Sequence, residues 1–176
     1  YSSMSEMDGH IYTMGNQNDT DIVWCFDAKT GDVVWKFEYP CELFDYMHEG
    51  GPGCTPTLDE KYVFTLSKEG QLFCLDRKTG KKIWEKDVTK EFGVEMPTWR
   101  FSNSPLLFDD EIIIDVGVIA AIDKASGNVN WKTKNYKPAY SSVIAFEYNG
   151  KQCLAAFPAP GLVLLDAETG DELASF

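Results

Sequence analysis

Histidine is scarce in this sequence, with only His10 and His48 among 176 residues. Catalytic zinc centres and Ser-His hydrolase sites both need imidazole groups beside other ligands or a nucleophile. No Gly-x-Ser-x-Gly elbow exposes Ser141 or Ser142 as a nucleophile, and no loop ends in the Gly-Lys-Ser/Thr of a phosphate-binding loop. We therefore expect no catalytic residues and no metal-binding residues.

Basic residues are also few, 16 against 28 acidic ones, which gives a net charge of -12. A surface of that sign repels nucleic acid phosphates and anionic membranes. No apolar run approaches the roughly 20 residues that span a bilayer, and the longest, Gly117 to Ile122, predicts a buried strand. Nucleic acid binding and membrane insertion are both disfavoured.

Paired cysteines are missing as well, since the five cysteines form no Cys-x-x-Cys motif. Cys25 and Cys74 each precede a repeated Asp by two residues on predicted buried strands, where a free thiol acts as a small apolar group. Cys41 and Cys54 fall in one loop region and could pair in an oxidising compartment. The odd total, completed by Cys153, leaves at least one thiol unpaired within the chain.

The sequence does contain a nine-residue motif, Asp-x-x-Thr/Ser-Gly-x-x-x-Trp, which recurs four times without gaps. Its copies start 49, 47 and 43 residues apart, a spacing that suits a four-stranded unit. The Asp carboxylate accepts backbone N–H groups and starts a turn, and the Gly supplies the positive φ of a type I turn with a bulge. The motif therefore predicts a β-hairpin.

Strands are predicted around each hairpin, and no helix of useful length competes. The strand before the hairpin is expected at Ile22 to Phe26, Leu72 to Leu75, Val118 to Ile122 and Leu162 to Leu165. The strand before that one is expected at His10 to Met14, Tyr62 to Leu66, Glu111 to Val116 and Gln152 to Phe157. With the strand after the turn and short segments upstream, such as Thr55 to Leu58, Ser104 to Leu107 and Ser141 to Ile144, each repeat has four strands.

A four-stranded sheet with two apolar faces buries both only when sheets stack face to face. The recurring Trp is then expected to cover the neighbouring sheet, which is a packing role rather than a binding role. The fourth motif has Ala174 in place of the Trp, so its interface is atypical. The predicted sheet-docking residues are Asp27, Gly31, Trp35, Asp76, Gly80, Trp84, Asp123, Gly127, Trp131, Asp166 and Gly170.

On these residues the chain resembles the pyrroloquinoline-quinone-type (quinoprotein-like) β-propeller repeat family. The resemblance implies an all-β fold of four-stranded antiparallel blades, here four of them at approximately 2–39, 54–88, 102–134 and 140–176. Four blades could close as a small ring or form half of an eight-bladed ring, and we favour the half. The sequence begins at Tyr1 rather than Met. We therefore expect further blades of the same polypeptide and, by resemblance, a periplasmic or secreted location.

The same family implies two competing functions. A dehydrogenase of alcohols or sugars would carry pyrroloquinoline quinone and calcium beside adjacent cysteines, and no Cys-Cys pair occurs here. We therefore favour a non-catalytic scaffold, without a cofactor, that binds a protein or a small ligand. A pure interaction scaffold is a third possibility.

Propeller ligands usually meet loops at one mouth of the channel, so the segments that enter each innermost strand are the predicted location of a site. Trp99, Arg100 and Asn103 offer a stacking face and directional donors for a sugar, a carboxylate or a peptide. His48, Glu49 and Tyr140 are expected to converge with them. Packing and turn formation is the competing interpretation, and an exposed turn is likewise favoured over calcium binding for the oxygen-rich segment Asn16 to Asp21.

Overall fold

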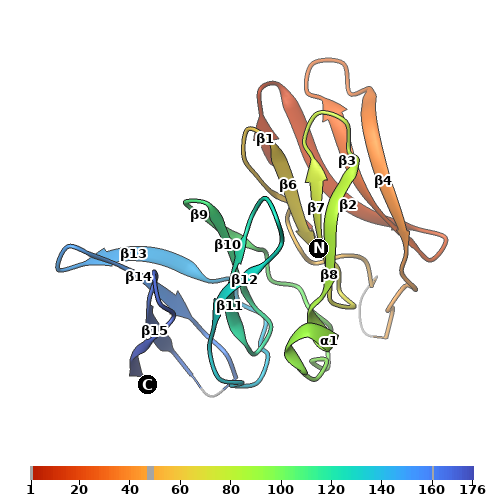
Figure 1. The fold of residues 1–176 in the computed structure, drawn as a ribbon. Coiled ribbons are helices and arrows are strands. Elements are labelled where there is room, and N and C mark those ends of the chain that lie inside the picture. The colour runs from red at the N-terminus through yellow and green to blue at the C-terminus, as the bar shows by residue number, and fades with distance from the viewer. Residues whose placement is uncertain (1, 47–49, 160) are drawn as a thin grey trace.

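The computed structural model describes residues 2–46, 50–159 and 161–176, which form four antiparallel sheets of four strands each (Figure 1). The first sheet contains β1 (Ser5–Met7), β2 (His10–Gln17), β3 (Thr20–Asp27) and β4 (Val33–Pro40). The second contains β5 (Thr57–Leu58), β6 (Tyr62–Leu66), β7 (Gln71–Asp76) and β8 (Lys82–Asp87). The third contains β9 (Leu106–Phe108), β10 (Glu111–Asp115), β11 (Ile119–Asp123) and β12 (Val129–Lys132). The fourth contains β13 (Ile144–Tyr148), β14 (Lys151–Ala156), β15 (Val163–Asp166) and β16 (Glu172–Ser175).

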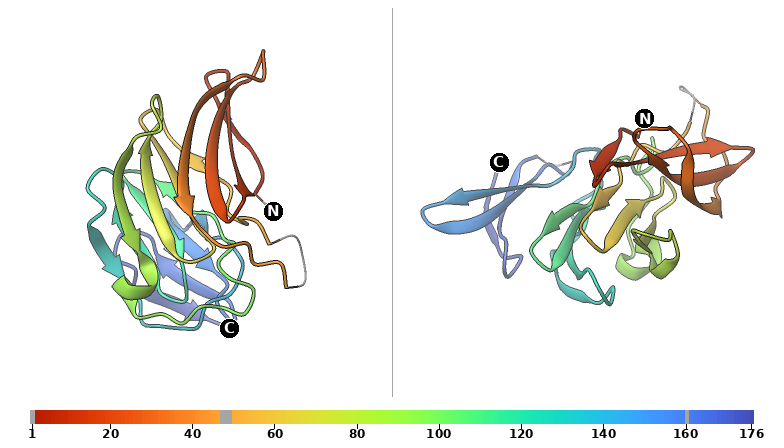
Figure 2. Two further views of the ribbon diagram at one scale, coloured as in Figure 1. Left: turned by 90° about the vertical axis from the view of Figure 1, so that its right-hand side faces the viewer. Right: turned by 90° about the horizontal axis from the view of Figure 1, so that it is seen from above.

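The sheets follow one another in an open arc, with the first and the fourth at opposite ends (Figure 2). Strand order within each sheet equals chain order, the meander expected of a propeller blade. The all-β blade prediction is therefore confirmed. We call the sheets blades 1 to 4.

Among the described residues there is one helix, the five-residue α1 (Val88–Phe92), which lies between blades 2 and 3 and is too short to alter the predicted all-β fold. The Asp87 carboxylate caps its N-terminus by accepting the N–H groups of Thr89 and Lys90, each at 3.2 Å. Gly93 ends the helix in the left-handed conformation at φ 62°. A single turn of helix carries no apolar periodicity, so only this Asp-Gly pair of caps could have indicated it.

The repeated motif forms the predicted hairpin in every blade. In blade 1, Asp27 Oδ1 accepts the N–H groups of Lys29 and Thr30, both at 2.8 Å, and Gly31 has φ 75°. The strand register shifts by a bulge directly before each motif, in blade 1 between Cys25 and Phe26. Hydrogen bonds from the turn lower the pKa of all four motif aspartates.

Each motif Trp docks onto the motif Gly of the next blade. A Cβ added to Gly80 would lie 2.5 Å from Cε3 of Trp35, so only glycine leaves room for the indole. Trp84 covers Gly127 and Trp131 covers Gly170 in the same way. The indole N–H of Trp35 donates to the Arg77 carbonyl at 2.9 Å, and that of Trp84 donates to the Lys124 carbonyl at 3.1 Å. The predicted packing role of these residues agrees with this geometry.

Just before the first strands of successive blades, residues at matching positions are joined by hydrogen bonds from a backbone N–H to a hydroxyl group. Ser3 N–H donates to Thr55 Oγ1 at 3.1 Å, Thr55 N–H to Ser104 Oγ at 2.9 Å, and Ser104 N–H to Ser142 Oγ at 2.9 Å. This hydroxyl chain holds the entrances of β5, β9 and β13 beside one another. The loops that precede those strands therefore lie side by side where the chain enters the first strand of each blade.

Candidate functional site

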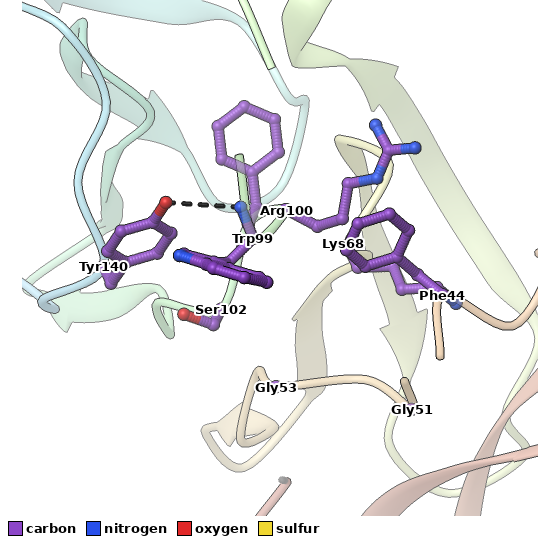
Figure 3. A pocket seen from close by; sticks show the side chains of 9 residues that line it. Phe44, Gly51, Gly53, Lys68, Trp99, Arg100, Ser102 and Tyr140 are labelled. Atoms are coloured by element: carbon purple, nitrogen blue, oxygen red, sulfur yellow. Dashed lines mark hydrogen bonds between the residues drawn. The ribbon is translucent and has the colours of Figure 1, made fainter. Parts of the chain in front are cut away.

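The converging loops enclose a cavity of about 360 Å³. Its wall combines aromatic side chains, two basic side chains and small residues that keep the space open (Figure 3). The lining residues are Phe44, Gly51, Gly53, Lys68, Trp99, Arg100, Phe101, Ser102 and Tyr140. We call this cavity the loop pocket.

The absence of a side chain at Gly53 lets the loops that line the pocket pack closely. A Cβ on Gly53 would lie 2.6 Å from the Ser102 Cβ, so a larger residue would push apart the loops that enter β5 and β9. These loops are adjacent because Thr55 and Ser104 belong to the hydroxyl chain. The packing of the blades therefore sets the shape of the pocket.

Trp99 and Tyr140 form one rim of the loop pocket and come from different blade connections. The Trp99 N–H donates to the Tyr140 hydroxyl at 3.2 Å (Figure 3). Their side chains are 38% and 43% exposed, which is high for large aromatic rings. Tyr46 adds a third ring, with its centroid 6.2 Å from that of Trp99. This rim offers exposed faces on which a planar or apolar group can stack.

Arg100 forms the opposite wall in a conformation that arginine seldom adopts, with φ 64°. Its guanidinium lies over the Phe44 ring, 4.6 Å from the centroid. Nε is 3.3 Å from Glu69 Oε1, close enough for an ion pair, yet the geometry does not make a hydrogen bond. The guanidinium is thus held in place by a ring and one carboxylate while retaining N–H groups that can bind an acceptor.

Lys68 supplies the second positive charge, at the base of the loop pocket, and is only 3% exposed. Its Nζ lies 3.4 Å from Asp21 Oδ1, so the buried ammonium is paired. Asp21 also accepts a hydrogen bond from Asn16 Nδ2 at 2.7 Å. The expected exposed turn is formed by Asn18 and Asp19 between β2 and β3, while Asn16 and Asp21 at its base bond to each other and Asp21 pairs with the lysine.

Three of the six predicted ligand-binding residues, Trp99, Arg100 and Tyr140, line the loop pocket. Asn103 does not, because it is 2% exposed and its Nδ2 donates to the Asp115 carbonyl beneath the loop. His48 and Glu49 lie outside the described residues. Phe44 and Lys68 were missed: Phe44 lies in the connection after β4, outside the repeated motif, and Lys68 occupies a short turn that resembles any solvated hairpin.

The cysteines show no disulfide. All five are free and buried, including Cys41 and Cys54, which were considered as a pair. Cys54 Sγ contacts the Leu66 N–H at 3.3 Å, whereas Cys41 Sγ accepts a hydrogen bond from Lys68 Nζ at 3.1 Å. The two thiols are thus engaged with separate neighbours.

A quinone with calcium would need acidic ligands, and the loop pocket presents Lys68 and Arg100 instead. Among the described residues, no group of three or more His, Cys, Asp or Glu side chains is placed to hold a metal ion. The side chains that line the loop pocket therefore do not fit a calcium-bound quinone. In the same described ranges, no helix is long and apolar enough to cross a membrane.

A family model described as outer membrane protein assembly factor BamB matches residues 10–175. The chain belongs to this family of BamB-like propeller repeats. The match covers all four motifs and every strand except β1, so family membership rests on the repeat itself. The resemblance to quinoprotein-like propellers predicted from the motif is confirmed.

Relatives with different activities are similar to this BamB-family chain. BamB of Burkholderia pseudomallei is 24% identical over 116 residues, which cover 63% of this chain and 27% of that protein. The quinohemoprotein alcohol dehydrogenase ADH-IIG of Pseudomonas putida is 22% identical over 140 residues, 72% of this chain and 18% of that enzyme. The chain thus spans about a quarter or less of the length of these curated relatives.

The solved structure of BamB from Moraxella catarrhalis superimposes with a TM-score of 0.69 at 16% identity. The superposition covers 98% of this chain and 50% of the BamB chain. At that identity the likeness shows the fold alone. It agrees with a blade arrangement equivalent to half of a BamB propeller.

Proposed function

We propose that this chain is a non-catalytic propeller segment that binds a protein partner at the loop pocket. The bound part of the partner is an acidic residue next to an aromatic or apolar residue. The observation that carries the proposal is the pairing of an exposed aromatic rim, Trp99 and Tyr140, with a fixed guanidinium, Arg100, around one cavity. Aromatic residues and arginine are the side chains that dominate binding at interfaces. The surrounding net charge of -12 makes this small basic patch the natural place for an acidic group.

The lining chemistry supports binding over catalysis. Within the described part of the pocket the polar side chains include Lys68, Arg100, Ser102 and Tyr140, and no histidine or carboxylate lies among the lining residues to act as a general base toward a nucleophile. The match to a family described as an outer membrane assembly factor also favours a scaffold role, and with it a location outside the cytoplasm. A quinone-dependent activity is the alternative that the dehydrogenase relatives suggest.

The experiment is a fluorescence or calorimetric titration with the acetylated, amidated tetrapeptide Asp-Phe-Asp-Phe and its Asn-Phe-Asn-Phe counterpart. We expect saturable binding of the acidic peptide and at least a tenfold weaker affinity for the neutral one, about 1.4 kcal/mol. Trp99→Ala and Arg100→Asn should each weaken binding of the acidic peptide by a similar factor. Asn is chosen at position 100 because it tolerates a positive φ.

The matched control is Trp24→Ala. Lys36 Nζ lies over the Trp24 ring, 5.8 Å from its centroid. Both residues belong to blade 1, and neither lines the loop pocket. The variant should bind the acidic peptide as the parent chain does. Equal affinity of all three variants, or equal binding of both peptides, would remove the loop pocket from the proposal. Saturable binding of pyrroloquinoline quinone that requires calcium would favour the alternative.

A further inference from the structure

A lysine amine and a cysteine thiol meet in the buried seam between blades 1 and 2. Lys68 Nζ donates to Cys41 Sγ at 3.1 Å, and the two residues are 3% and 5% exposed. Among the five cysteines, all of which the structure describes, Cys41 is the one with a lysine Nζ as a hydrogen-bond partner. We propose that Cys41 and Lys68 form a covalent N–O–S crosslink under oxidising conditions, with one oxygen atom bridging Nζ and Sγ.

The backbone on both sides holds this pair in position. The Cys41 N–H donates to the Asp19 carbonyl at 2.9 Å, and the Cys41 carbonyl accepts from Asn16 Nδ2 at 2.9 Å. The Lys68 carbonyl accepts from the Phe101 N–H at 3.1 Å. Neither residue can move far without breaking these bonds, so the sulfur and nitrogen stay at a distance that one oxygen atom can bridge.

The reaction needs a peroxide as oxidant, and its steps balance. Peroxide oxidises the thiol to a sulfenic acid and leaves as water. A second peroxide condenses with the sulfenic acid to give a sulfur-bound hydroperoxide and a second water. The neutral Lys68 amine then attacks the sulfur-bound oxygen of that hydroperoxide, which forms the N–O bond, breaks the O–O bond and releases the terminal OH, with a proton from the amine, as a third water. In sum, a thiol, an amine and two molecules of peroxide give one N–O–S bridge and three molecules of water.

The surroundings suit the product as well as the reactants. Lys68 loses its positive charge when the bridge forms, and Asp21 then loses its ion-pair partner. Asp21 is still held by Asn16 Nδ2 at 2.7 Å and by the Tyr39 hydroxyl at 3.4 Å, so the carboxylate keeps hydrogen-bond donors. Lys68 also lines the loop pocket, which gives a small oxidant a route to the seam.

The test is intact mass spectrometry of the full chain before and after treatment with hydrogen peroxide in mildly alkaline buffer. Alkaline conditions are chosen because burial raises the pKa of the Cys41 thiol to about 11, and the thiolate is the reactive form. We expect a mass gain of about 14 Da, one oxygen added and two hydrogens lost, that dithiothreitol reverses. Peptide mapping without reduction should show Cys41 and Lys68 in one crosslinked species.

Variants distinguish the bridge from ordinary thiol oxidation. Cys41→Ser and Lys68→Arg should both abolish the reversible gain, and Lys68→Arg retains a positive charge beside Asp21. Cys54→Ser is the matched control, since Cys54 is equally buried but has no lysine partner, and the crosslink should persist in it. A gain of about 16 Da or a loss of about 2 Da at Cys41, which indicate a sulfenic acid or a direct S–N bond, would overturn the proposal, as would no change in mass. The mass change and the peptide map of the unsubstituted chain distinguish these outcomes, so the test does not depend on whether the variants fold.

Discussion

The seam between blades 1 and 2 and the seam between blades 3 and 4 use the same motif but differ in what surrounds it. In the first seam the Trp35 indole N–H is bonded to the Arg77 carbonyl, and Phe37, Tyr39 and Phe73 form a ring cluster with centroids 4.7 to 6.0 Å apart. In the second, Trp131 Nε1 is buried with no hydrogen-bond partner in the described structure. The neighbours of Trp131 are mainly aliphatic, and they form a core separate from the one that joins blades 1 to 3.

Blades 1 and 3 also differ in the surroundings of their buried carboxylates. Asp21 in blade 1 is paired with Lys68, whereas Asp115 in blade 3 is only 3% exposed and accepts the Gly117 N–H at 2.9 Å. No salt bridge of Asp115 is found among the described residues. The difference teaches that the repeat fixes how blades dock, while residues outside the motif set how strongly each pair of blades is held.

The largest expected effect comes from truncating the docking indoles. Trp35→Ala removes a nearly buried indole, a hydrogen bond and contacts to Tyr12, and we expect it to lower the free energy of unfolding by about 4 kcal/mol. Trp131→Ala removes no hydrogen bond, so we expect its loss of unfolding free energy to be about 1 kcal/mol smaller than that of Trp35→Ala. Urea unfolding followed by circular dichroism measures both. Equal losses would mean that accessory contacts do not distinguish the seams.

The carboxylates provide a test that depends on pH. Burial raises the pKa of Asp115 to about 6, although the Gly117 N–H lowers it in part. The folded state then holds the proton more tightly than the unfolded chain, so the stabilisation is fully present below the ordinary Asp pKa of 3.8 and is lost as the pH rises through about 6. By pH 8 the loss is about 3 kcal/mol.

Asp115→Asn removes this titration and should make the chain more stable than the parent at pH 8, with little difference at pH 4. Asp21→Asn is the counterpart, and it should destabilise at pH 8 by about 3 kcal/mol because Lys68 is left buried without its partner. Thermal unfolding at the two pH values measures both variants. A shift in the same direction for both at pH 8 would contradict the distinction between a paired and an unpaired carboxylate.

Glycine substitutions test the docking contact itself. Gly80→Ala places a methyl group against the Trp35 ring and strains a φ of 69°, and we expect a loss of about 3 kcal/mol. Gly31→Ala has a similar φ of 75° but meets no atom within 4 Å, so only the backbone cost of about 1 kcal/mol applies. The difference in unfolding free energy isolates the docking contact. The difference should vanish when each glycine is replaced separately in a Trp35→Ala background.

The fold was predictable because the motif fixes each hairpin locally. The turn needs an Asp acceptor, a hydroxyl and a glycine in sequence, and the spacing of the copies then sets four strands per blade. Strand ends were less well predicted: β2 was expected at His10 to Met14 but continues to Gln17, because Asn16 pairs with Asp21 across the hairpin. Such a side-chain bond depends on partners that periodicity does not reveal.

The site was predictable only in part. Trp99, Arg100 and Tyr140 were found because they are unusual residues in loops that enter first strands. Lys68 was missed because its role arises from contacts with Asp21 and Cys41 in the preceding blade, 47 and 27 residues away. Asn103 was placed at the mouth because polarity suggests exposure, whereas the fold uses it to satisfy a buried carbonyl.

The hydroxyl chain through Thr55, Ser104 and Ser142 has a consequence for how such a molecule can change during evolution. Each link is one backbone N–H that donates to a hydroxyl of the next blade, so blades 2 and 3 each take part as a donor on one side and an acceptor on the other. Duplicating or deleting one whole repeat would leave each remaining junction with the same chemistry. Gene rearrangement by complete repeats could therefore alter blade number without redesigning any junction, whereas a break inside a repeat would leave a donor without its acceptor.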